Sequence, residues 1–229
     1  MNIKKIFLSF TAIILLAVSA GQVQAGSWGI GFKVDAHNLD TGVSDDIDSN
    51  GTVNSTATYS DRVIAGSIFV ERNIDTPFGS VALGVSYIPI DADIDKRSIS
   101  QSSVKAKADG AASSGTNSAE GTIKDHYTIY LQPGFNVGEN LVYLNFGLSF
   151  ADINGKSNSI SSTNISETKD LEGTQLGIGV KHSLDNGGFV KLEFTSTEYD
   201  QVSWTTSNST KGMADLDDTV LSLAVGKQF

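Results

Sequence analysis

The sequence contains no cysteine, so it offers no disulfide, no thiolate metal site and no cysteine for lipid anchoring. Beyond Ala25 it has no run of about 18 apolar residues, so we expect no later segment to cross a membrane as a helix. Basic residues are also few, because 16 Lys and Arg stand against 26 Asp and Glu, for a formal net charge of −10. This charge balance argues against nucleic acid as a partner.

The amino-terminal segment has the composition of a secretory signal peptide. Two lysines precede an apolar run that ends at Ala20, and small residues follow at the cleavage positions. We expect cleavage after Ala25, which divides the chain into a signal peptide (1–25) and a mature domain (26–229). Cleavage after Ala20 and a retained membrane helix are the alternatives. The apolar run is shorter than the roughly 20 residues of a spanning helix, which favours the signal peptide.

Eight segments of the mature region alternate large apolar residues with small or polar ones. The clearest is 142–151, where Val, Leu, Phe, Leu and Phe alternate with Tyr, Asn, Gly, Ser and Ala. The last segment alternates in the same way and ends on Phe229. Alternation with a period of two is typical of a strand with two unlike faces. The eight predicted strands are 28–35, 62–72, 81–87, 126–135, 142–151, 175–181, 190–195 and 219–229.

The connections between these strands alternate between long and short. Long polar loops are expected at 37–60, 152–170 and 200–215, and the polar tract 91–121 is expected to form a hairpin beyond the membrane. Short turns are expected at 75–79, 136–140 and 184–188, the last with an Asn-Gly hairpin signal. The pattern predicts an all-β fold, an eight-stranded antiparallel up-and-down transmembrane β-barrel with short periplasmic turns and long extracellular loops. A sheet that crosses lipid must close, because an open edge leaves backbone groups unsatisfied.

Two stretches resemble known proteins. The terminal segment resembles the signal that the bacterial barrel-assembly machinery reads, although Lys227 stands where an aromatic residue is usual before Phe229. Residues 190–200, with the sequence Val-Lys-Leu-Glu-Phe-Thr-Ser-Thr-Glu-Tyr-Asp, are similar to the penultimate strand of OmpA-like and opacity-type outer-membrane barrels. The resemblance implies a location in the outer membrane, with its lipids and the barrel-assembly machinery as partners.

Charged residues on the predicted inward face suggest the content of the barrel. An interior of eight strands is just wide enough to be filled by side chains, so we expect these charges to form an internal ion-pair network. A small channel is the alternative. The predicted inward charges are Lys33, Asp35, His126, Lys181, Lys191 and Glu193. Aromatic girdles are expected near the strand ends, with Trp28, Phe78, Phe135, Phe189 and Phe229 on the periplasmic side and Tyr87, Tyr127 and Phe150 on the other.

The histidines do not form an obvious reactive set. His37 is expected in or beside the first loop, His126 in the lumen and His182 in the lipid-facing row near the periplasmic rim. No pair has metal-ligand spacing within one element. Barrel enzymes that trim lipid A place their His, Ser and Glu on the outer wall near the extracellular leaflet. We therefore expect no catalytic residue.

An alternating acidic stretch resembles the start of a calcium loop. It contains Asp91, Asp93 and Asp95, but Lys96 occupies the position where such a loop needs Gly. We expect no metal-binding or cofactor-binding residue and no cofactor. The predicted function is that of a non-enzymatic outer-membrane barrel with a structural or adhesin-like role, exerted through its long acidic extracellular loops and an unknown surface ligand. A small-solute or ion channel, a lipid A-modifying enzyme and a soluble periplasmic β-barrel are the alternatives.

Overall fold

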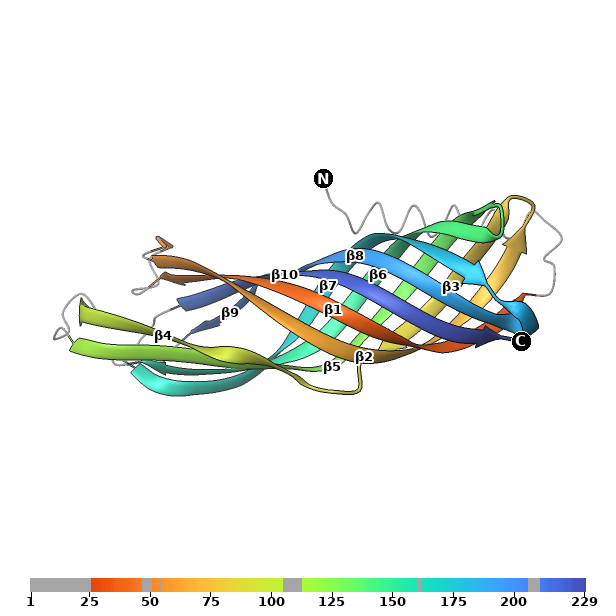
Figure 1. Cartoon of the computed structure of the whole chain (residues 1–229). Helices are drawn as coiled ribbons and strands as arrows, with labels where there is room; N and C mark the ends of the chain where they lie inside the picture. The colour runs from red at the N-terminus through yellow and green to blue at the C-terminus, as the bar shows by residue number, and fades with distance from the viewer. Residues whose placement is uncertain (1–25, 47–50, 54, 105–112, 160–161, 206–210) are drawn as a thin grey trace.

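The computed structural model describes residues 26–46, 51–53, 55–104, 113–159, 162–205 and 211–229 (Figure 1). The predicted signal peptide lies outside the described residues. The described chain forms a single antiparallel sheet of ten strands, with a short 3-10 turn, η1, at Asp185–Gly187. The strands are β1 (Ser27–Asp46), β2 (Ser55–Thr76), β3 (Gly79–Tyr87), β4 (Ala92–Val104), β5 (Ser113–Val137), β6 (Asn140–Ser159), β7 (Ser162–Ser183), β8 (Gly188–Tyr199), β9 (Val202–Thr205) and β10 (Lys211–Gln228).

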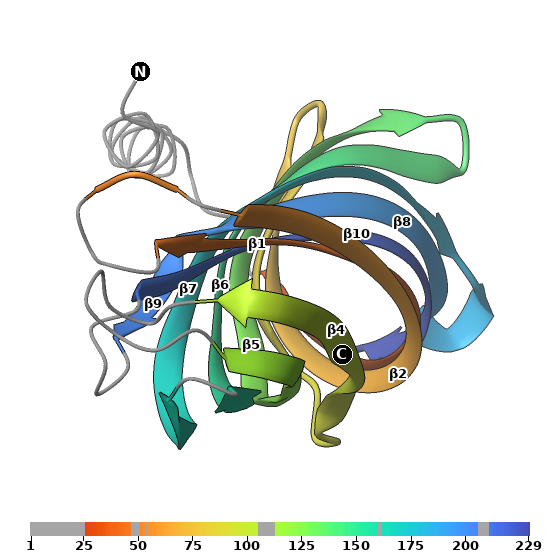
Figure 2. The ribbon, with the colours of Figure 1, turned by 90° about the vertical axis from the view of Figure 1, so that its left-hand side faces the viewer.

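Eight of these strands close into a ring. The order is β1-β2-β3-β5-β6-β7-β8-β10, and the last strand pairs with the first. At the seam, the backbone N–H groups of Trp28 and Phe229 each donate to the carbonyl of the other residue, at 2.9 Å. Figure 2, a view along the barrel, shows how the strands curve around into a wall. The predicted fold class is confirmed.

A belt of large apolar side chains surrounds the outside of the ring. Phe32 is 67% exposed and Ile64 is 79% exposed, and their outward neighbours on the adjacent strands are apolar as well. Within the described residues, no helix is long and apolar enough to cross a membrane. An apolar exterior on a closed sheet, whose backbone groups pair within the wall, fits a bilayer. Members of the belt include Ile30, Val34, Ile68, Val70, Leu83, Val85, Ile129, Leu144, Ile178, Val180, Leu192, Phe194, Leu221, Leu223 and Val225.

Inside the ring, aromatic side chains lie on glycines of the neighbouring strand. Tyr130 faces Gly84, and a Cβ atom added to that glycine would come within 2.4 Å of the Tyr130 ring. Tyr143 lies over Gly179 in the same way. The small residues of the inward face therefore leave room for large rings beside them. The other pairs in register are Phe69 with Gly31, Phe189 with Gly226, Tyr199 with Gly173, and Trp204 with Gly212.

Most of the predicted long loops are strands. β1 and β2 fill much of the segment 37–60, β6 and β7 most of 152–170, and β9 and β10 parts of 200–215. Those loop predictions were wrong because strands beyond the bilayer need no lipid-facing apolar row, so the apolar alternation stops while the backbone ladder continues. The described parts of 91–121 do form the expected hairpin, made of β4 and the start of β5.

Beyond the belt, the wall divides into two parts. The chain leaves the sheet at 88–91, between β3 and β4, and at 200–201, between β8 and β9. Among the described residues, no ladder joins β2 to β4 or β7 to β9. We call the upper parts of β9, β10, β1 and β2 the first lobe, and β4 with the upper parts of β5, β6 and β7 the second lobe. Figure 1 shows the two lobes diverging on the left.

Candidate functional site

A buried carboxylate lies at the centre of the lumen within the belt. The Glu71 side chain is fully buried and accepts hydrogen bonds from Lys191 and, at 3.2 Å, from Tyr130 Oη. Lys181 Nζ lies 3.8 Å from the other Glu71 oxygen. The two lysines come from neighbouring strands β7 and β8, across the barrel interior from β2. One carboxylate therefore holds two cations inside the ring.

A second carboxylate extends this network. Glu193 accepts hydrogen bonds from Gln132 at 2.7 Å and Asn145 at 3.0 Å, and Lys33 Nζ lies 3.9 Å away. Lys191 also donates to Gln132 Oε1 at 3.1 Å, which links the two carboxylate centres. The buried charges thus have the partners that a low-dielectric interior requires.

The predicted inward charges all point into the barrel, and Lys33, Lys181, Lys191 and Glu193 form ion pairs. Asp35 accepts a hydrogen bond from Ser67 instead. Sequence reasoning missed Glu71 as the centre of the network. The available signal was the alternation of the strand, which puts Glu71 on the same inward face as Ala65 and Ser67.

Aromatic rings fill the remaining space beside the network. Lys191 Nζ lies 5.2 Å from the ring centroid of Phe69 and 5.6 Å from that of Phe189. Phe189 is 1% exposed, so its expected place in the periplasmic girdle was wrong. Phe189 lies on the same inward face of β8 as Lys191. Its ring lies beside that of Phe69, with the ring centroids 6.1 Å apart. The cavity left in this part of the lumen is only ≈ 10 Å³, about the space of one water molecule.

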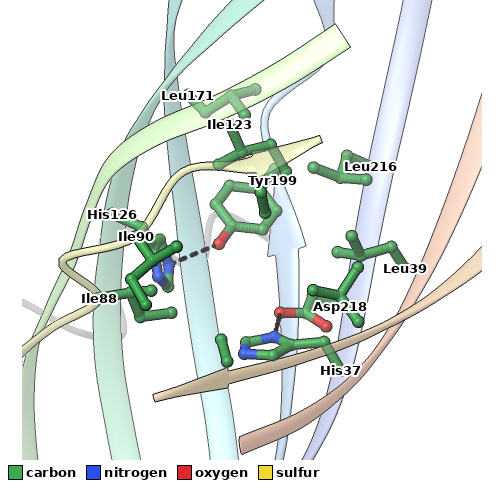
Figure 3. A pocket seen from close by; sticks show the side chains of 13 residues that line it. His37, Leu39, Ile88, Ile90, Ile123, His126, Leu171, Tyr199, Leu216 and Asp218 are labelled. Carbon is green, nitrogen blue, oxygen red and sulfur yellow. Dashed lines mark hydrogen bonds and ion pairs between the residues drawn. The ribbon is translucent and has the colours of Figure 1, made fainter. Parts of the chain in front are cut away.

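Above the belt, the interior contains an apolar cluster. Leu39, Ala151, Leu171, Tyr199 and Leu216 form a buried cluster contributed by both lobes. A cavity of ≈ 40 Å³ opens beside this cluster (Figure 3). We call it the interlobe cleft. It is lined by His37, Leu39, Val63, Ala65, Ile88, Ile90, Ala92, Ile123, His126, Leu171, Tyr199, Leu216 and Asp218.

Two polar pairs lie in the wall of the interlobe cleft. His37 Nδ1 lies 2.7 Å from Asp218 Oδ2, and Tyr199 Oη lies 2.9 Å from His126 Nε2 (Figure 3). The far atoms of the first pair, His37 Nε2 and Asp218 Oδ1, are buried and have no partner in the described structure. Buried polar atoms are nearly always paired, so these two atoms indicate a site that a further group could complete.

The structure places the histidines as follows. His126 faces the interior, as expected, and His182 is exposed on β7 near the short turns, within 2.9 Å of Asn140 Oδ1. His37 is a strand residue that points inward, so its expected place in or beside a loop was wrong. Sequence reasoning did not bring it together with Asp218, because the two lie on opposite ends of the chain and meet only through the closing β1–β10 ladder.

The acidic stretch of the predicted calcium-like segment begins just before β4 and continues along it. Asp91 pairs with Lys124 at 3.2 Å, and Asp93 accepts from Thr122 at 2.9 Å. The side chain of Asp95 lies outside the described residues. Within the part of the chain that the structure describes, no three His, Asp or Glu residues are grouped as a metal site.

A closed antiparallel ring with an apolar belt outside and a charged, filled lumen inside defines a transmembrane β-barrel. The family model for the outer membrane protein beta-barrel domain matches residues 8–229. The chain belongs to this family and resides in the outer membrane.

Solved structures of outer-membrane proteins are similar to this chain. The protease OmpT of Escherichia coli is 7% identical, with a TM-score of 0.51, over 91% of this chain and 99% of OmpT. The attachment invasion locus protein Ail of Yersinia pestis is 10% identical, with a TM-score of 0.39, over 86% of this chain and 97% of Ail. At such identities the OmpT likeness shows the fold alone. Comparison with the curated proteins gave no match.

Proposed function

We propose that this protein is a non-enzymatic barrel that presents a rigid, acidic β-sheet surface outside the cell for interaction with cationic partners. The observation that carries the proposal is the contrast between a filled membrane section and an extended extracellular wall. Within the belt, the cavity beside the ion network and the rings measures ≈ 10 Å³. A cavity of that size holds about one water molecule, which favours a filled lumen over the channel alternative.

The extracellular wall is long and built from paired strands. The belt ends near Tyr127 on β5, and the strand begins at Ser113, so roughly 40 Å of β5 extends above the belt. β6 pairs with β7 up to Ser159 and Ser162. Paired strands hold side chains in fixed positions, as a binding surface requires, at a lower entropic cost on binding than loose loops.

The outward face of the first lobe, together with the adjoining end of β8, carries carboxylates in a row. Asp217 on β10 is the register partner of both Asp40 on β1 and Glu198 on β8, and all three residues have outward parity. Like charges directly opposite each other in a sheet are destabilising. A cationic partner would relieve this repulsion, which favours the row as the contact surface.

The positions of the three histidines disfavour the lipid A-modifying alternative. His37 and His126 point inward, and His182 is exposed at the periplasmic end. None of the three lies on the outer wall near the extracellular leaflet, where an enzyme acting on lipid A would need it.

The test measures binding of fluorescent polylysine to the purified barrel in nanodiscs of neutral phosphatidylcholine. The parent should bind, and added salt should weaken binding because exposed charges are screened. A triple variant with Asp40→Asn, Asp217→Asn and Glu198→Gln should bind several-fold more weakly.

A matched control removes the same charge from the periplasmic turns. It carries Asp75→Asn, Glu139→Gln and Asp185→Asn, all at exposed positions. The control should bind like the parent. Equal losses in both triple variants would show that net charge alone drives binding, and no binding by the parent would refute the proposed surface.

A further inference from the structure

The interlobe cleft has the composition of a small-molecule site rather than of a packed core. Nine of its lining residues are aliphatic: Leu39, Val63, Ala65, Ile88, Ile90, Ala92, Ile123, Leu171 and Leu216. Its ≈ 40 Å³ exceeds the roughly 10–15 Å³ that one water needs. Ligand pockets are typically apolar with a few polar groups that fix orientation.

The polar groups of the cleft are incomplete on one side. The side chains of His37 and Asp218 are 10% and 5% exposed, and they come from the adjacent strands β1 and β10. His37 Nδ1 and Asp218 Oδ2 form a hydrogen bond with each other. His37 Nε2 and Asp218 Oδ1 have no partner among the described residues. A buried acceptor without a partner is destabilising, so an occupant that donates a hydrogen bond is favoured here.

The chain also offers an entrance to this cleft. Above the belt no ladder joins β2 to β4 in the described structure, and the segment 88–91 crosses the gap between them. Ile88 and Ile90 of this segment line the cleft, and Ile90 is 68% exposed. Apolar side chains therefore lead from the exterior, just beyond the lipid belt, to the His37–Asp218 pair.

We propose that the interlobe cleft binds a small amphipathic alcohol, with a compact hydrocarbon body and one hydroxyl group. The hydrocarbon lies against the aliphatic wall. The hydroxyl donates to Asp218 Oδ1. The site is independent of the acidic outward row of the first lobe, so either assignment can fail without the other.

The test uses cyclohexanol, cyclohexane and cyclohexylammonium as probes for the barrel in phosphatidylcholine nanodiscs. Isoleucine methyl NMR signals report on the cleft through Ile88, Ile90 and Ile123. Cyclohexanol should shift these signals saturably, whereas cyclohexane should bind at least about tenfold more weakly, because it makes no hydrogen bond to the charged acceptor.

Variants separate recognition from partitioning into lipid. Asp218→Asn should weaken cyclohexanol binding by about tenfold or more. Asp215→Asn, an exposed position on the outward face of the same strand, should leave binding unchanged. Ala92→Phe, which narrows the cleft at the edge of β4, should abolish the saturable shifts. Heat-modifiable migration on gels verifies folding of each variant.

Three outcomes would overturn the proposal. Absence of saturable cyclohexanol shifts in the folded parent would mean that water or the chain's own side chains complete the site. Equal binding of cyclohexane, with no effect of Asp218→Asn, would reduce the cleft to a nonspecific apolar gap. Tighter binding of cyclohexylammonium than of cyclohexanol would assign the site to cations instead of alcohols.

Discussion

Replacing Glu71 with Gln would test whether the lumen network holds the membrane section together. The substitution keeps the size of the side chain and removes the negative charge that faces Lys191 and Lys181. Both lysine side chains are 6% exposed and would stay buried without their counter-charge. Breaking a buried ion pair by removing one partner typically costs about 3–5 kcal/mol.

This cost is large against a total stability of about 5–15 kcal/mol for a folded domain. A double variant, Glu71→Gln with Lys191→Met, should recover part of the loss, because the most closely paired cation is removed together with its partner. Glu167→Gln is the matched control. Its pair with Lys169 is 3.1 Å long but half exposed, and surface pairs contribute about 0–1 kcal/mol.

The assay is equilibrium unfolding by urea from phospholipid vesicles, followed by tryptophan fluorescence and by heat-modifiable migration on gels. Glu71→Gln should lower the urea midpoint markedly, and Glu167→Gln should leave it almost unchanged. A Glu71→Gln barrel as stable as the parent would refute the reasoning, since the two lysines would then not need the carboxylate.

Further predictions concern the outer face, the inner face and assembly. Phe146→Arg, in the belt, should cost about 2–4 kcal/mol in vesicle unfolding, whereas Asn154→Arg on the same face beyond the belt should cost little; equal effects would contradict the position of the belt. Gly84→Ala should destabilise the barrel by about 1–3 kcal/mol through overpacking, and Gly155→Ala, where an added Cβ meets nothing within 4 Å, should not; the same unfolding assay compares them. Planar-bilayer recordings should show no stable conductance steps, and reproducible steps would overturn the filled lumen. Deleting Phe229 should slow insertion by purified barrel-assembly machinery, and an unchanged rate would argue against recognition of this terminus.

The membrane section could be predicted from the sequence because two environments act on alternate residues. Leu144 and Phe146 face lipid, while Asn145 and Gly147 face the lumen, so the sequence itself shows the period of two. Outside the bilayer this contrast ends, and the strand parts of 37–60 and 152–170 were read as loops. The pairing of His37 with Asp218 depends on a ladder between residues 181 positions apart, which local patterns do not contain.

The glycine–aromatic pairs also limit how the strands can align during assembly. A slip of β5 by one residue against β3 would turn Tyr130 toward lipid. A slip by two would set its ring opposite Ala82 or Ser86, whose Cβ atoms would occupy the space that Gly84 leaves empty. Similar pairs occur at five other places around the wall, including the β8–β10 and β1–β2 ladders. We therefore expect each pair to disfavour a misaligned register locally, wherever two neighbouring strands of the wall come together.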